Sequence, residues 1–301
     1  MSRVWDYNQE NAMKKCLIVI NLMSGRAARI DRSKLLSRFG AAYDVAFKEI
    51  RNDSDEWSAQ GFDLVVACGG DGTFNRALNL CSADAVPLIY YGFGTFNECA
   101  KAKGAKKGSR EFLRLYEYAS VNGRFFGYVA ATGTFTPLGY IVPPSEKQKL
   151  GIFAYLARVL GEYRVCSVPA TVTADGTTFT GNYTLVMAID SVRCFGFRFN
   201  RLYRPDDGKI QLLLIKSPGK DSFLNRARIF FPFFRAFFIG FRREVTTKNV
   251  VFRSAKSLTI STRAPETYDI DGDRAELDTL VEISVTTPKN EVYIGDFDML
   301  S

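Results

Sequence analysis

The sequence predicts an α/β protein in two parts: an N-terminal doubly wound, Rossmann-like parallel sheet domain and a C-terminal, mainly antiparallel β-sandwich domain. Three observations lead to this expectation. The length of 301 residues exceeds that of one average domain. The first part of the chain alternates short apolar runs with helical segments, which is typical of a parallel sheet covered by helices. Later segments alternate β-branched and aromatic residues with polar ones, which favours antiparallel strands.

The N-terminal domain is expected over residues 14–122. Its apolar runs predict strands at residues 15–21, 43–50, 63–68 and 86–91. Helices are predicted at residues 33–39, 55–60 and 74–81, and the last two begin near Asp or Thr residues that can cap a helix. This alternation predicts a doubly wound half.

The second, β-rich domain is expected over residues 123–290. Its predicted strands are residues 170–173, 183–188, 209–215, 257–261 and 280–285. Asp-Gly pairs mark turns at residues 175–176, 207–208 and 271–272. A helical insert at 150–161 and an aromatic and basic segment at 223–243 interrupt the strands. For residues 291–301, a return to the first domain is one option.

The composition excludes several classes of site. The chain has no histidine, so a Ser-His-Asp triad, a histidine base and an imidazole metal ligand are excluded. Any acid–base chemistry falls to Asp, Glu, Lys, Tyr or water. The six cysteines lack C-x-x-C spacing and are interpreted as reduced thiols of a cytosolic protein. Charged residues near the N-terminus argue against a signal peptide, so a cytoplasmic location is expected.

The charge distribution indicates an anionic partner. The formal net charge is +8, and residues 220–256 contain nine Lys or Arg against two acidic residues. A second basic cluster, at residues 101–114, follows the candidate phosphate site. A nucleic-acid partner is not expected, because no RNA- or DNA-binding motif accompanies the charge.

Three turns follow predicted strands of the first domain, at the sheet edge where doubly wound proteins bind ligands. They are Asn-Leu-Met-Ser-Gly at 21–25, Gly-Gly-Asp-Gly-Thr at 69–73 and Gly-Phe-Gly-Thr-Phe-Asn at 92–97. Glycines let backbone amides approach phosphate oxygens, and a following helix adds positive potential. Asp71 supplies a carboxylate suited to Mg²⁺. One such turn is usually only a tight turn, but three in succession predict a phosphate site, although the Walker pattern is absent.

These motifs resemble the diacylglycerol kinase catalytic-domain family, which includes bacterial lipid kinases and sphingosine and ceramide kinases. Residues 17–25 resemble its N-x-x-S-G turn, residues 64–75 its G-G-D-G-T signature, and residues 94–97 its G-T-x-N turn. Further segments, at 149–155, 205–208, 251–260 and 271–273, follow in the family's order. The resemblance therefore spans nearly the whole chain.

The resemblance implies roles for particular residues. ATP would be held by Asn21, Ser24, Gly25, Gly69, Gly70, Asp71, Gly72, Thr73, Asn75, Gly94, Thr95 and Asn97. Asp71 would also be catalytic by organising Mg²⁺, and Asp273 would be the base that deprotonates a lipid hydroxyl. A second, structural Mg²⁺ would be bound by main-chain oxygens of Arg204 and Lys209 and the carboxylate of Asp207.

The sequence departs from the family's usual motifs at four positions. Leu22 and Gly92 replace prolines, Glu98 replaces an aspartate, and Asp273 replaces a glutamate. Asp273 is one methylene shorter than the usual base, so the backbone must supply the missing reach.

The segment 223–243 combines aromatic and basic residues with helical spacing. Six phenylalanines would share one arc of a helix: Phe230, Phe231, Phe234, Phe237, Phe238 and Phe241. Arg228, Arg235 and Arg242 recur beside that arc and argue against a membrane span, and Pro232 is expected to begin or kink the helix. Two interpretations remain: a buried aromatic face, or an interfacial element on an anionic membrane.

The sequence as a whole thus predicts an ATP- and Mg²⁺-dependent kinase with a lipid substrate, acting from the cytoplasm at a membrane surface. A soluble-substrate kinase of the NAD kinase or phosphofructokinase type is an alternative, because those enzymes also use G-G-D-G-[TS]. A non-catalytic nucleotide- or lipid-binding module is a second alternative.

Overall fold

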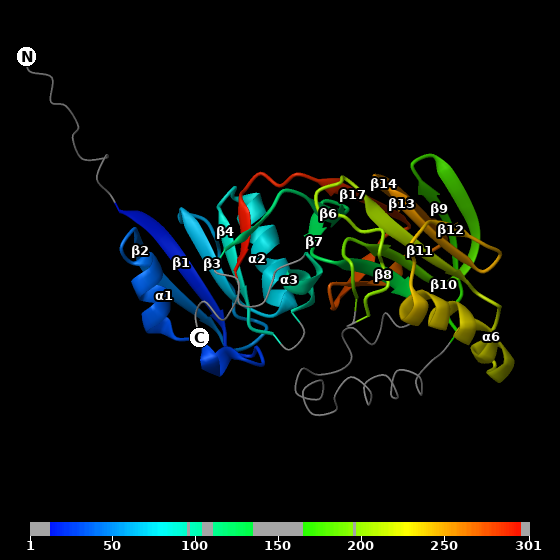
Figure 1. The fold of residues 1–301 in the computed structure, drawn as a ribbon, viewed down its shortest axis with the longest axis horizontal. Coiled ribbons are helices and arrows are strands. Elements are labelled where there is room, and N and C mark those ends of the chain that lie inside the picture. Colours follow the sequence, from blue (N-terminus) through cyan, green and yellow to red (C-terminus); the bar gives the residue numbers. More distant parts are fainter. Residues whose placement is uncertain (1–12, 95–96, 104–110, 135–164, 195–196, 296–301) are drawn as a thin grey trace, which may run out of the picture.

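The computed structural model describes residues 13–94, 97–103, 111–134, 165–194 and 197–295. Two sheet-based parts lie side by side along the long axis of the molecule (Figure 1). The blue and cyan part is N-terminal, and the green to orange part follows it. The helical insert expected at 150–161 lies outside the described residues, as do Thr95 and the motif residues 149–155.

The first sheet is mainly parallel. In spatial order it contains β2 (Tyr43–Ile50), β1 (Lys14–Asn21), β3 (Leu64–Gly69), β4 (Leu88–Gly92), β18 (Val292–Gly295) and β5 (Leu113–Leu115). Among the described strands of this sheet, only the pairing of β18 with β5 is antiparallel. The strand β18 therefore brings the C-terminal end of the described chain into the N-terminal sheet, where it appears in red in Figure 1.

Helices cover both faces of this sheet because alternate residues of each buried strand point to opposite sides. Ile18 and Cys68 pack with Leu35 of α1 (Arg32–Phe39). Val19 and Ala67 belong instead to the cluster that contains Leu78 of α2 (Asp71–Ala83). The remaining short helices of this part are α3 (Glu98–Ala102) and a 3-10 turn at Ala27–Arg29. The doubly wound expectation is confirmed.

The second sheet is antiparallel and curls around its own apolar core. Its main path runs β12 (Val245–Thr246), β13 (Val250–Ala255), β11 (Ile210–Lys216), β10 (Thr177–Ile189), β9 (Val168–Ala174), β14 (Ser257–Thr262), β17 (Leu280–Thr286), β6 (Tyr118–Val121) and β7 (Arg124–Phe126). β8 (Val129–Gly133) pairs with β10 and with β15 (Glu266–Ile270), which pairs with β16 (Asp273–Leu277). The predicted fold class is thus confirmed.

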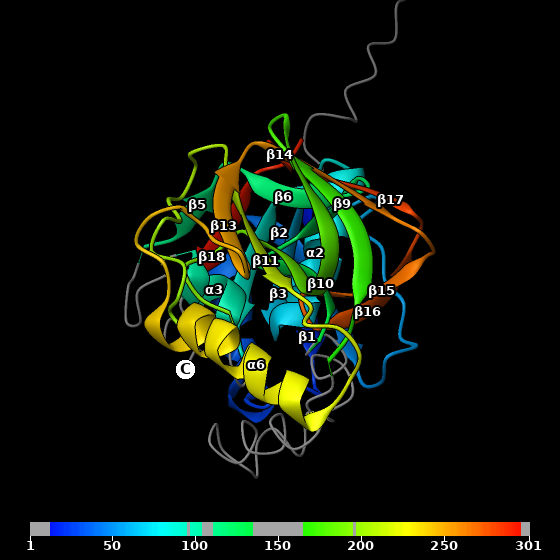
Figure 2. The ribbon, with the colours of Figure 1, turned by 90° about the vertical axis from the view of Figure 1, so that its right-hand side faces the viewer.

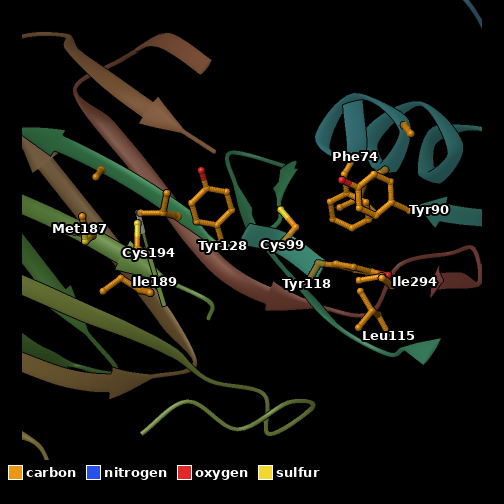
Figure 3. Packing of buried hydrophobic residues seen from close by; sticks show 14 of the residues in the cluster. Phe74, Tyr90, Cys99, Leu115, Tyr118, Tyr128, Met187, Ile189, Cys194 and Ile294 are labelled. Carbon is orange, nitrogen blue, oxygen red and sulfur yellow. The ribbon is translucent and has the colours of Figure 1, made fainter. Parts of the chain in front are cut away.

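One apolar cluster continues from the first part into the second. Phe74 and Tyr90 of the first sheet layer belong to the same buried cluster as Tyr128 and Met187 of the second. Figure 3 shows these side chains, with Cys99 and Tyr118 between them. This shared core packs the first sheet layer against β8 and β10 of the second part.

The helix expected at 55–60 is wrong, since this segment is a loop between β2 and β3. Polar side chains here bond to the local backbone instead: Asp55 accepts from the amides of Arg51 and Asn52, and Ser58 Oγ accepts from the Gln60 amide. Such local bonds compete with helical ones. Trp57 also packs on the core, which holds the loop in place.

The aromatic and basic segment forms α6 (Phe223–Phe234), which lies along the outside of the second part (Figure 2). Ser222 caps its first turn by accepting from the Asn225 amide. Pro232 lies within the helix, and a π-helical turn, Arg235–Ile239, follows it. A proline removes one backbone donor, which is consistent with the altered turn just after it.

Candidate active site

The three glycine-rich turns converge at the carboxyl ends of β1, β3 and β4. The Phe93 amide donates to the Gly69 carbonyl at 2.6 Å, and the Arg26 amide donates to the Phe93 carbonyl at 3.0 Å. A Cβ on Gly94 would lie 2.7 Å from Cα of Gly70, so only glycine allows these two turns to approach so closely. The turns expected to hold phosphates are therefore packed against one another as one structure.

Side chains of the first two turns reinforce this arrangement. Asn21 donates through Nδ2 to Thr73 Oγ1 at 2.9 Å and accepts the Met23 amide at 2.9 Å. Ser24 lies close by, with Oγ 4.0 Å from where a Cβ on Gly70 would stand, and Gly25 is exposed in the same turn. Around Gly72, in the first turn of α2, nothing lies within 4 Å of a would-be Cβ.

The third turn ends at Asn97, which precedes α3 with a left-handed φ of 47°. Its Nδ2 donates to the Gly92 carbonyl at 2.8 Å. Its Oδ1 is buried and has no hydrogen-bond partner among the described residues. A buried acceptor without a partner is costly, and this one lies 2.8 Å from a would-be Cβ on Gly94, beside the packed glycine turns. A phosphate oxygen cannot donate to this amide oxygen, so the fit to a phosphate-bearing ligand rests on the glycine turns and on the open space about Gly72.

Asp71 begins α2, after Gly70 at the N-cap. Its Oδ1 accepts the Cys99 amide at 2.9 Å, which ties the start of α2 to α3. Burial is the main cause that raises the pKa values of Cys99, Tyr90 and Tyr128, and the nearby charge of Asp71 raises them further. Within the described ranges, no three Cys, Asp or Glu side chains group so as to hold a metal. Asp71 as an organiser of Mg²⁺ therefore stays a prediction.

Asn75 lies one helical turn after Asp71 but faces the second part of the molecule. Its Nδ2 donates to Asp271 Oδ2 at 2.7 Å and to the Phe125 carbonyl at 3.2 Å, and the side chain is buried. The nucleotide contact of Asn75 stays a prediction. The structure gives its amide a joining role between α2 and the strands beyond.

Asp271 is the acceptor at the centre of that joint. Besides Asn75, the amides of Gly127, Tyr128 and Val129 donate to its carboxylate, the last two at 2.9 and 3.0 Å. Burial raises its pKa to about 6, and these four donors act in the opposite direction. Since its oxygens are already engaged, Asp271 holds the β15–β16 hairpin in place and is poorly suited to be a base.

Asp271 and Gly272 form the two-residue turn between β15 and β16, and both have positive φ, at 55° and 96°. Asp273 is the first residue after this turn. Such a turn suits a tight hairpin. The Asp273 side chain is about half exposed, at 53%, and its Oδ2 lies 3.5 Å from an Arg124 guanidinium nitrogen. Partial burial raises its pKa, Arg124 lowers it and Asp53 raises it. The predicted base thus lies at the surface of the joint between the two parts.

The predicted structural Mg²⁺ loop is folded back on itself and on the β5–β6 connection. Asp207 Oδ1 accepts the Lys209 amide at 3.1 Å, and Arg204 donates to the Tyr203 carbonyl at 2.9 Å. The carboxylate of Glu117 accepts the Gly208 amide at 2.9 and 3.0 Å. Sequence reasoning missed Glu117, because no motif surrounds it. The metal assignment of Arg204, Asp207 and Lys209 stays a prediction.

A buried ion pair forms a second joint between the two parts, and sequence reasoning missed this one too. Lys103, just after α3, places Nζ 2.5 Å from Asp190 Oδ2 at the end of β10, and the side chains are 3% and 4% exposed. The Ala119 amide donates to the same carboxylate oxygen at 3.2 Å, and Nζ lies 5.3 Å from the centre of the Tyr203 ring. The third turn is therefore coupled to the second sheet through α3.

Comparison with known proteins agrees with this architecture. Residues 15–118 match the family model of the diacylglycerol kinase catalytic domain, which confirms the resemblance drawn from the motifs. A diacylglycerol kinase of Bacillus subtilis (strain 168) is 25% identical over 288 residues, covering 87% of this chain and 90% of that protein. A diacylglycerol kinase of Staphylococcus haemolyticus is 23% identical over 307 residues, covering 92% and 90%.

Solved structures show the same fold at lower sequence identity. A crystal structure of a diacylglycerol kinase from Bacillus anthracis str. Sterne is 19% identical to this chain, with a TM-score of 0.62. The match covers 93% of this chain and 96% of that one. Both parts of the fold are therefore shared with a protein of that description.

Proposed function

We propose that this diacylglycerol-kinase-like chain is an ATP-dependent lipid kinase, which transfers the γ-phosphate to a hydroxyl of a diacylglycerol-like or sphingoid-like lipid. One observation carries the proposal. The packed glycine turns with Asp71 lie at one end of α2, and Asn75 of the same helix joins the hairpin that carries Asp273. Helix α2 would therefore link the proposed phosphate site to the proposed base.

The chemistry follows from that arrangement. Amides of the glycine turns would hold the phosphates, and bound Mg²⁺ would offset their negative charge near Asp71. The carboxylate of Asp273 would take the proton of the lipid hydroxyl while the hydroxyl oxygen forms a bond to the γ-phosphorus. The bond between that phosphorus and the bridging oxygen would break, and ADP would leave. Holding both groups in place accounts for most of the rate in such transfers.

The acceptor class can be tested directly. Purified protein with ATP and Mg²⁺ is offered diacylglycerol, a sphingoid base and phosphatidylglycerol in vesicles, and NAD and sugar phosphates in solution. We expect labelled phosphate in one lipid fraction and none in the soluble acceptors. Transfer to NAD or a sugar phosphate would establish a soluble-substrate kinase, and ATP binding without any transfer would establish a binding module.

We also propose that α6 contacts the membrane. The predicted arc of six phenylalanines is divided: Phe241 is buried and Phe237 partly so, whereas Phe230, Phe231, Phe234 and Phe238 are exposed. The buried face is formed instead by Ile229, Phe233 and Ala236. Phe231 and Phe238 are 73% and 59% exposed, which is unusual for such rings in water. Within the described residues, no helix has the length and apolarity to cross a membrane.

The arginines beside this face fit an anionic surface. Arg228 and Arg242 are exposed, while Arg235 donates to the Gly240 carbonyl at 2.6 Å and lies against the Phe241 ring. Rings at the acyl boundary with guanidiniums at the headgroups would combine apolar and electrostatic attraction. Salt screens the electrostatic attraction.

Vesicle co-sedimentation tests this contact. Replacing Phe231 and Phe238 with Ser should lower binding to anionic vesicles. Replacing Arg228 and Arg242 with Gln should make vesicle binding less dependent on salt concentration. The matched control is Leu280→Ser, because Leu280 is 53% exposed but lies on β17. ATP affinity should be unchanged throughout. Equal binding by all variants to neutral and anionic vesicles would refute the contact.

A further inference from the structure

Arg124 is a partly exposed residue on a backbone segment that is fixed at both ends. It follows the tight turn at Asn122 and Gly123, whose φ values are 47° and 81°, and it pairs with Val121 across the hairpin of β6 and β7. The next residue, Phe125, is fixed to α2: its amide donates to Asn79 Oδ1 at 2.9 Å, and its carbonyl accepts from Asn79 Nδ2 at 3.0 Å. The backbone next to Arg124 is therefore hydrogen-bonded to α2.

The guanidinium of Arg124 bridges two residues of the candidate site. It donates to Asn75 Oδ1 at 3.3 Å and lies 3.5 Å from Asp273 Oδ2. Asn75 is itself fixed by its bonds to Asp271 and Phe125. A guanidinium is planar, always charged and able to donate in several directions at once, so it suits this bridging place better than an ammonium group.

Among the described residues, Arg124 is the one side chain that pairs with Asp273. Its side chain is half exposed, and the charged groups that act on it are Arg124 on β7 and Asp53 in the loop after β2. Asp53 repels the carboxylate, and Arg124 attracts it. The next residue, Arg274, pairs with Glu276 at 2.6 Å instead.

We propose, on the basis of the proposed function, that Arg124 is a positioning residue, which orients the Asp273 carboxylate against α2 and the phosphate site. An exposed ion pair of this kind contributes little to stability, so a purely structural role predicts a nearly silent substitution. A positioning role predicts instead that the substitution changes the pKa of Asp273 and lowers kcat.

The first test does not depend on activity. The carboxyl carbon of Asp273 is followed by NMR in protein labelled with ¹³C-aspartate and is assigned by its absence in Asp273→Asn. In Arg124→Gln we expect the Asp273 pKa to rise, because the opposing charge is gone and burial and Asp53 remain. The matched control is Arg274→Gln, which should leave this titration unchanged. Identical titration curves in wild type and Arg124→Gln would overturn the proposal.

The second test is kinetic. Arg124→Gln should lower kcat by about 10- to 100-fold, as for a misplaced reacting group, and leave the KM for ATP unchanged. Because Asp273 must be deprotonated to accept a proton, a higher pKa should move the acidic limb of the pH profile to higher pH. Arg124→Lys should recover part of the rate, and Arg124→Gln with Asp273→Asn should be no slower than Asp273→Asn alone.

The two tests separate the outcomes. A raised KM for ATP with an unchanged Asp273 titration would mean that Arg124 binds phosphate, which contradicts positioning. A wild-type protein without lipid phosphorylation would remove the proposed function, and the NMR titration would still decide whether Arg124 acts on Asp273.

Discussion

Removing Lys103 should destabilise the protein strongly, because it leaves a charge buried without its partner. Lys103 and Asp190 are both nearly inaccessible, and their charged atoms are 2.5 Å apart. In Lys103→Met, the Asp190 carboxylate keeps the Ala119 amide as a donor and loses the opposite charge. Breaking one side of a buried ion pair costs about 3–5 kcal/mol, so we expect a loss of that size at pH 7.5.

The same variant should become relatively more stable as the pH falls. Burial already raises the pKa of Asp190 to about 6 while Lys103 opposes the rise, so without Lys103 the pKa should be higher still. The folded variant then binds a proton that the unfolded chain, with a pKa of about 4, releases. Its stability therefore increases as the pH falls from 7.5 towards 5, as the neutral acid replaces the buried charge.

Urea unfolding at pH 7.5 and pH 5 measures both effects. Lys103→Met with Asp190→Leu should recover most of the loss, because it removes the remaining charge. Arg226→Met is the control, since the Arg226–Asp221 pair is exposed and its loss should be negligible. A loss below about 1 kcal/mol at pH 7.5, or an equal loss at both pH values, would refute the reasoning about this joint.

Three further changes test the rest of the site. Asp71→Asn should lower turnover by about 10²-fold or more with an unchanged unfolding midpoint, and near-normal turnover would remove Asp71 from the chemistry. Gly94→Ala should weaken ATP binding in a calorimetric titration, because its Cβ would lie 2.7 Å from Cα of Gly70; unchanged affinity would mean that the two turns do not form the phosphate site. Asn75→Ala should lower the free energy of unfolding by about 1–3 kcal/mol in urea, because it leaves a buried Asp271 oxygen without that donor, and an unaltered value would show that the joint does not depend on it.

The features predicted correctly from sequence are those with a local pattern. The apolar run at 43–50 predicts β2 at its observed bounds, and the distinctive spacing of the glycines after β3 predicts the turn that follows it. The helix periodicity of segment 223–243 was also readable. The sequence does not show which side of that helix is buried, because this depends on the strands against which Ile229 and Phe233 pack.

The joints between the two parts have no local pattern. Asn75 and Asp271 are 196 residues apart, and Lys103 and Asp190 are 87 residues apart. In the sequence Asp271 is only the first residue of an Asp-Gly turn, and sequence alone cannot show that three backbone amides and Asn75 surround it. The expected helix at 55–60 failed for a related reason: the capping residues were recognised, but they close a loop instead of starting a helix.

A single-turnover experiment tests the central claim, that one active site uses ATP on the first sheet and Asp273 on the second. Excess protein with labelled ATP and vesicles containing the preferred lipid is quenched over time, for wild type and Asp273→Asn, and ATP binding is measured for both. We predict equal ATP affinity and a rate of lipid phosphorylation about 10²–10⁴-fold lower in the variant, with Asp273→Glu active. Equal rates for wild type and Asp273→Asn would contradict the account.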